Sequence, residues 1–327
     1  MKYEFCFYNE NYYSDLIRLA LCSYEWEIPA VGLSRIEFSN SLGKIFLDTH
    51  TAWEKTVGCY LEHGKMVACV WNEAGYDGNI YFLFDSKVRA QEETLLLDMI
   101  KFAKTYGAGY QKENSRVRAV NLHIPEWNDV LRRVCEEHGF CKSDWAECLN
   151  LFDFQEKQYE VNLPEGYRII DGTVSNAVQI ANVHRHSFGY GAWDRATEYG
   201  HEAFEAVRKT KYYDPELELC VLDKENRPVA IANIWYDESM PYCELEPLAV
   251  CWWERRKGIG TAVLHEAMNR VMRKYPDCRG MLGGDQLFYK SIGYKTKAKV
   301  LTYHWETEVF LSWEAKSLYM NYAKEVE

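Results

Sequence analysis

The residue types best suited to chemistry gather in one short segment, where an apolar stretch runs into a basic, glycine-containing turn. The stretch ends with Leu248, Ala249 and Val250, and the turn continues through Arg255, Arg256, Lys257, Gly258, Ile259, Gly260 and Thr261 into a helical pattern. Glycine lets a backbone turn tightly and approach a ligand closely. The free N–H groups of a first helical turn attract anions, and the neighbouring cations add to that field. The segment therefore predicts a pyrophosphate site; the structural alternative is an ordinary strand-to-helix turn.

Two widespread phosphate loops do not fit this segment. Val263 stands where the third glycine of a dinucleotide loop would be, and no Gly-Lys-Ser/Thr follows four residues after a glycine. The segment instead resembles the acyl-CoA loop of the GNAT N-acetyltransferase superfamily, Arg/Gln-x-x-Gly-x-Gly/Ala, with Arg255, Gly258 and Gly260 at its defined positions. A second segment, Leu287 to Tyr294, is similar to the family's Leu-Tyr-x-Lys-x-Gly-Phe motif and follows in the family's order.

The resemblance implies acetyl-CoA as co-substrate and assigns roles to these residues. The N–H groups of Arg256 to Thr261 would hold the pyrophosphate, and main-chain groups near Leu248, Ala249 and Val250 would bind the pantetheine arm. Tyr289 matches the family tyrosine that lies near the CoA sulfur and acts as general acid; a core aromatic is the structural alternative. The chain departs from the family at Gly283-Gly284-Asp285-Gln286, where members often have an asparagine.

The resemblance also implies a general base on the strand before the loop. Protein-modifying members keep a glutamate eleven residues before the loop's Arg/Gln, and Glu244 has that position here. Glu246 lies two residues further on, hence on the same face of a regular strand. Burial raises a carboxylate pKa, which suits the removal of a proton from an ammonium ion. Either glutamate is a candidate, and a structural salt bridge is the alternative for both.

The elements around these motifs repeat once along the chain. Strands are predicted at Thr56–Leu61, Met66–Trp71, Asn79–Phe84, Tyr167–Ile170, Leu217–Leu222, Val229–Tyr236 and Cys243–Val250, with final strands at Ala146–Phe154 and Lys299–Trp305. A helical pattern follows each inner set of strands. Together with the resemblance, this element order implies the fold class α/β (α+β), with two GNAT-like domains, each expected to be a mixed, mostly antiparallel twisted sheet flanked by helices. We expect a degenerate domain at residues 1–156 and an acetyl-CoA-binding domain at residues 157–327.

The first half lacks the features of the acyl-CoA loop. If Arg89 is aligned with Arg255, Glu92 and Thr94 stand at the two glycine positions. Their side chains would block a close approach, and the carboxylate would repel a pyrophosphate. The first half is therefore expected to shape the acceptor pocket and to bind no cofactor of its own.

The acceptor is expected at the connection from His184 to Asp194, which mixes His, Asp and aromatic residues. Such a connection could hold an amine by cation–π and charge contacts, and a surface loop is the alternative. Neither His184 nor His186 has a sequence partner that indicates a metal, so none is predicted.

Composition limits the partners. The chain has 327 residues, 38 Lys and Arg against 49 Asp and Glu, and a net charge of −11, so nucleic-acid binding through the general surface is not expected. No apolar run is long enough to span a bilayer and no signal peptide is visible. The 11 cysteines are scattered without a Cys-x-x-Cys pair, which favours free thiols in the cytoplasm. The oligomeric state stays open.

The predicted function is transfer of an acetyl group from acetyl-CoA to a primary amine, on a small molecule or a peptide. A non-catalytic acyl-CoA sensor or interaction module is the first alternative. Aminoacyl transfer from a charged tRNA is the second, against which the net acidity and the intact acyl-CoA loop count.

Overall fold

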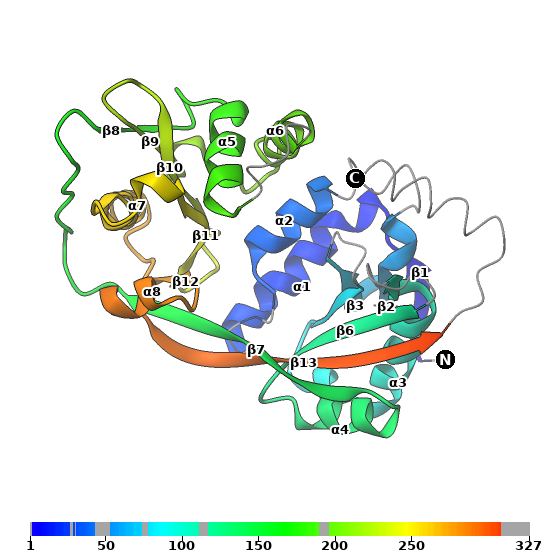
Figure 1. Ribbon diagram of the computed structural model, residues 1–327. Helices are drawn as coiled ribbons and strands as arrows, with labels where there is room; N and C mark the ends of the chain where they lie inside the picture. Colours follow the sequence, from blue (N-terminus) through cyan, green and yellow to red (C-terminus); the bar gives the residue numbers. More distant parts are fainter. Residues whose placement is uncertain are drawn as a thin grey trace. The chain divides into compact units, whose positions relative to one another are not determined.

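Two units of mixed α/β structure make up the chain in the computed structural model, which describes residues 2–26, 29, 31–42, 53–73, 78–110, 117–189 and 196–308 (Figure 1). Unit 1 consists of the described residues up to Cys148 together with Ala298–Glu308, and unit 2 consists of Leu149–Lys297. None of the described helices is both long and apolar enough to cross a membrane.

Unit 1 is built on the sheet β1-β2-β3-β4-β6-β13, in which only β4 and β6 run parallel. Helices α1 and α2 are on one side of this sheet and α3 and α4 on the other (Figure 1). The elements are β1 Glu4–Phe7, α1 Tyr13–Trp26, α2 Leu33–Leu42, β2 Gly58–Glu62, β3 Lys65–Asn72, β4 Asn79–Phe84, α3 Glu93–Phe102, β5 Gly109–Tyr110, β6 Val117–Pro125 and α4 Asp129–Glu137.

Unit 2 repeats this plan with the sheet β7-β12-β11-β10-β9-β8, in which only β11 and β12 run parallel. Helices α5 and α7 lie on either side of β10 (Figure 1). The elements are β7 Cys141–Asp153, β8 Arg168–Asp171, α5 Ala177–Ser187, α6 Ala196–Val207, β9 Glu218–Leu222, β10 Pro228–Trp235, β11 Cys243–Val250, α7 Ile259–Lys274, β12 Gly280–Gly283, α8 Leu287–Ile292 and β13 Lys295–Glu308.

Local sequence explains the elements that carry the site. Strand β11 has the predicted bounds, and α7 begins directly after Gly258. The apolar face predicted for α7 is buried, including Val263, Ala267 and Val271, so the helix is held by packing against the sheet. Helix α5 begins with a capping box between Asn176 and Gln179, which satisfies two N–H groups of its first turn. The predicted fold class, mixed α/β structure with mostly antiparallel β-sheet flanked by helices, is confirmed.

The final strands of the two halves are exchanged between the units. Asn150–Asp153 of β7 pair with β12 in unit 2, and Val300–Glu308 of β13 pair with β6 in unit 1. The units therefore change over at Cys148–Leu149 and again at Lys297–Ala298, whereas the sequence suggests one boundary at residue 157. Both halves end in strands of the same pattern, so local sequence does not distinguish which sheet edge each strand joins.

Candidate active site

Strand β11 presents one unpaired edge next to the glycine-containing turn. Its parallel pairing with β12 covers only Cys243–Met281 and Glu244–Leu282, although β11 continues to Val250. On its other edge it pairs with β10 as far as Val250. Within the described part of the chain, the main-chain groups from Leu245 to Val250 therefore lack a strand partner on the β12 side. The carbonyl oxygens of Glu246 and Val250 accept hydrogen bonds from the side chains of Trp235 and Arg255. The other groups on this edge could pair with an extended amide-containing chain such as pantetheine.

The turn after β11 has the backbone geometry of an anion site. Gly258 is the N-cap of α7 with φ 81°, and no side chain caps the helix there. A Cβ at Gly258 would meet nothing within 4 Å, so no neighbouring atom crowds this position of the turn. Arg256 also has a positive φ of 68°, which is uncommon for a residue with a side chain and is found at functional sites.

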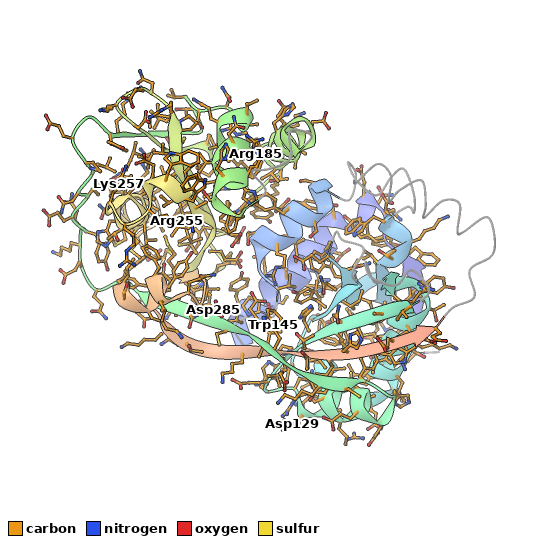
Figure 2. The ribbon with its side chains drawn as sticks, viewed as in Figure 1. Asp129, Trp145, Arg185, Arg255, Lys257 and Asp285 are labelled. Atoms are coloured by element: carbon orange, nitrogen blue, oxygen red, sulfur yellow. The ribbon has the colours of Figure 1, made fainter. Side chains whose placement is uncertain are left out.

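Two of the three predicted cations are engaged within the protein, at the start of α7 (Figure 2). The Arg255 guanidinium donates to the carbonyl oxygens of Val250 at 3.2 Å and Ser187 at 2.6 Å. Lys257 Nζ lies 2.9 Å from a carboxylate oxygen of the buried Glu254. These side chains fix the turn, so its N–H groups and the exposed Arg256 are left to meet a ligand.

Tyr289 lies on α8 and is buried, with 8% of its surface exposed. Desolvation raises the pKa of its hydroxyl well above the ordinary value, the nearby Glu246 carboxylate raises it further, and a backbone hydrogen bond from Gly284 acts against both. The phenol is therefore protonated at neutral pH, the form required of an acid. The electrostatic effect of Glu246 on Tyr289 links two residues that the sequence nominated separately.

The glycine pair before α8 makes room for this tyrosine. A Cβ on Gly283 would lie 2.8 Å from a ring carbon of Tyr289 and 2.8 Å from one of Tyr294. A Cβ on Gly284 would lie 2.9 Å from the Tyr289 ring. The sequence shows these glycines only as a departure from the family pattern, and their packing role could have been suspected from their position directly before the tyrosine.

The two candidate bases are in different environments. Glu244 is buried, with 4% exposed, whereas Glu246 is exposed. The expectation that they share a face of the strand stays a prediction, because a β-bulge next to Glu246 shifts the β10–β11 register between Ala232–Leu248 and Ile234–Leu245. That bulge adds one residue to β11 and re-aims the side chains around it. The Glu246–Pro247 peptide within it is cis.

Only the first part of the predicted acceptor connection is described. His184 lies on α5 between Phe188 and Phe204, with ring centroids 4.7 and 5.4 Å away. Burial lowers its pKa to about 4, so the ring is neutral at pH 7. His186 contacts Trp253 at 5.0 Å between centroids. Residues 190–194 lie outside the described residues.

The corresponding turn of unit 1 is occupied by its own side chains. Arg89 pairs with Asp85 at 2.8 Å and Glu62 at 3.0 Å. Glu92 is the N-cap of α3, the place that Gly258 has in α7. Partial burial acts to raise the Glu92 pKa, but hydrogen bonds, first from Tyr3, lower it overall. An ionised carboxylate thus stands where the turn of unit 2 is open.

No metal centre is evident in the described ranges. Among those residues, no group of three or more His, Cys, Asp or Glu side chains could hold a metal ion.

Comparisons with known proteins agree with this architecture. Residues 180–294 match the sequence model of the acetyltransferase (GNAT) family. A search of curated protein sequences found no match.

Several solved structures share the fold over nearly the whole chain. A GCN5-related N-acetyltransferase from Sphaerobacter thermophilus aligns with a TM-score of 0.59 and 14% identity, covering 95% of this chain and 98% of that chain. A tandem GNAT protein from the clavulanic acid biosynthesis pathway, without AcCoA, aligns with a TM-score of 0.59 and 12% identity, covering 95% of this chain and 99% of that chain. A GNAT-family acetyltransferase from Colwellia psychrerythraea aligns with a TM-score of 0.55 and 10% identity, covering 92% of this chain and 99% of that chain.

At these identities the structural likeness establishes the fold, and the family match supports acyl transfer in general. The chain thus contains an acetyltransferase (GNAT) family domain at residues 180–294 and has the fold of a tandem GNAT protein.

Proposed function

We propose that the chain is an N-acetyltransferase that moves an acetyl group from acetyl-CoA to a primary amine, at a site in unit 2. One observation carries the proposal: a glycine-capped helix start adjoins a strand edge that β12 leaves unpaired, and Glu246 of that strand acts electrostatically on Tyr289 of α8. The open turn suits the pyrophosphate, and the edge suits the pantetheine amides.

The same geometry supports a direct transfer. A glutamate accepts a proton from the incoming ammonium, and the free amine forms a C–N bond with the thioester carbonyl carbon as the C–S bond breaks. Tyr289 gives its proton to the departing sulfur, and the proton that the nitrogen then loses returns to the tyrosinate. Acetyl-CoA supplies the activated acetyl group, while binding and orientation supply much of the rate.

Two features support unit 2 as the location. In unit 1, Glu92 stands at the helix start and Arg89 is held by Asp85 and Glu62. In addition, the buried Asn128 donates to the carbonyl oxygen of Ala90 at 2.9 Å, inside the turn itself. In this proposal, unit 1 therefore binds no acetyl-CoA and has a structural role.

Glu244 and Glu246 both remain candidates for the base, and the geometry favours Glu246. Its carboxylate is exposed and near Tyr289, so an ammonium ion can reach it from solvent, whereas Glu244 is buried where β11 still pairs with β12. A base must lie within hydrogen-bond reach of the proton that it removes.

The matched variants Glu246→Gln and Glu244→Gln test this assignment. Each keeps the side-chain shape and removes its basicity. In an amine-panel assay with acetyl-CoA, we expect Glu246→Gln to lower kcat by about 10²-fold, within the usual range for acid–base catalysis, and to shift the activity profile toward higher pH. Loss of activity only in Glu244→Gln moves the role to Glu244. Acetyl-CoA binding without turnover of any amine would favour the sensor alternative.

A further inference from the structure

Trp235 contacts the bulge in β11 directly. This residue ends β10 opposite Glu244 and is completely buried, with 0% exposed. Its indole N–H donates to the main-chain carbonyl oxygen of Glu246 at 2.7 Å. Ala232 pairs with Leu248 and Ile234 pairs with Leu245. The pairs are thus two residues apart on β10 and three apart on β11. The carbonyl that Trp235 binds therefore belongs to the segment containing the extra residue.

A bulge leaves main-chain groups without ladder partners, and buried carbonyls need a substitute donor. Trp235 supplies one for Glu246. Along β11, Glu244 is buried where β12 still pairs with the strand, and Glu246 is exposed beyond that pairing. The bulge thus fixes the main chain from which the Glu246 side chain projects, next to the Glu244–Leu282 pair, and Gly283, the residue after Leu282, lies against the Tyr289 ring.

Unit 1 has a buried tryptophan, Trp71, on the strand β3, where the pairing with β4 contains no bulge. Trp71 on β3 lies opposite Tyr81 of β4 and is also 0% exposed. The β3–β4 pairing keeps a regular register from Ala68–Phe84 to Asn72–Ile80. Within the described residues, the Trp71 indole nitrogen is buried without a hydrogen-bond partner. Both tryptophans fill a core, and only Trp235 uses its N–H on the neighbouring strand.

We propose that Trp235 is a positioning residue that fixes the β11 bulge through the Glu246 carbonyl and so holds the Glu246 carboxylate beside Tyr289. The inference rests on the proposed function, in which this carboxylate accepts the ammonium proton. Trp235 itself lies in the core and acts only through the backbone of Glu246.

Trp235→Phe tests the proposal, since it keeps a large aromatic ring and removes the donor. We expect kcat to fall up to about 10²-fold, as for a reacting group misplaced by about 1 Å, and the pH profile to change. The KM for acetyl-CoA is expected to stay within about threefold, because the Arg256–Thr261 turn is unaltered. Trp71→Phe is the matched control: it makes the same ring replacement in unit 1 and should leave kcat unchanged.

A double-mutant cycle separates positioning from packing. If Trp235 acts through Glu246, Trp235→Phe has little further effect on kcat once Glu246→Gln is present. Equal losses in Trp235→Phe and Trp71→Phe, or additive losses in the double variant, would overturn the proposal.

A second readout does not depend on turnover. The NMR titration of the Glu246 carboxyl, assigned with Glu246→Gln, should move by about half a pH unit or more in Trp235→Phe as the carboxylate leaves its present surroundings. If the wild-type protein transfers acetyl to no amine, the proposed function fails. The titration of Glu246 then still tests whether Trp235 positions the Glu246 carboxylate. An unmoved titration contradicts it.

Discussion

At the residue scale, Tyr289 and its surroundings define what the site can do. Desolvation and the neighbouring Glu246 keep the phenol protonated, while the exposed carboxylate stays accessible to a cationic amine. In the proposed transfer, Tyr289 as acid and Glu246 as base would be the two proton carriers that amide formation from an ammonium and a thioester requires.

Replacement of Tyr289 by Phe tests the acid. The variant keeps the ring that packs against Gly283 and loses only the hydroxyl. We expect kcat to drop by about 10²-fold with little change in acetyl-CoA affinity, because the hydroxyl matters only when sulfur departs. Steady-state kinetics and calorimetric titration check the two parts. An unchanged kcat would leave the hydroxyl a structural role.

Residue types and spacing predict the turn between β11 and α7, which the structure contains, whereas the role of Tyr289 stays a prediction. The bulge next to Glu246 could not be predicted this way, because a register shift depends on the pairing with β10 and not on the residue types of β11 alone. The attachment of Arg255 to Ser187 was equally hidden, since it joins residues distant in the sequence.

At the element scale, the connection between β12 and α8 determines where Tyr289 lies. Gly283 and Gly284 bring the strand end against the tyrosine ring, and any side chain there would displace it.

Gly283→Ala should therefore disable the site without touching the turn. The new methyl group would lie 2.8 Å from ring carbons of Tyr289 and Tyr294, and such overpacking typically costs about 1–3 kcal/mol. We expect a lower kcat with acetyl-CoA affinity retained. Gly107→Ala in unit 1 introduces a comparable contact, 2.7 Å from Ile80 Cδ1, and is the control. Equal losses of activity in both variants would indicate general destabilisation instead.

The strands of both halves could be predicted from apolar patterns, and β4 and β11 have the predicted bounds. The exchange of the ends of β7 and β13 could not, because strand partners depend on which sheet edge is free and not on the pattern of the strand itself.

At the scale of the whole molecule, the two units share a plan and differ in what fills it. Unit 1 buries a histidine next to its parallel strand pair: His123 stacks on Tyr81 with 4.6 Å between centroids. Burial, and then the charge of Arg35, lowers its pKa to about 3.

The lowered pKa of His123 makes the free energy of unfolding depend on pH. The unfolded chain binds the proton near pH 6.5 and the folded chain only near pH 3, so stability is lost as pH falls through that window. Between pH 7 and pH 5, the free energy of unfolding should fall by about 2 kcal/mol less in His123→Asn than in the wild type. Urea unfolding of both proteins at both pH values measures the difference. Parallel losses in the two proteins would contradict a neutral buried imidazole.

The central claim is that acetyl-CoA binds in unit 2 alone, and calorimetric titration of acetyl-CoA tests it most directly. We expect one molecule per chain. Gly260→Asp should remove most of the affinity, because it places a negative charge at the turn. Gly260→Ala should retain it, since a Cβ there meets only Val250 and Phe288, at 3.4 and 3.5 Å. Thr94→Asp, at the same place in α3, should have no effect. Two molecules bound per chain, or full affinity in Gly260→Asp, would contradict the account.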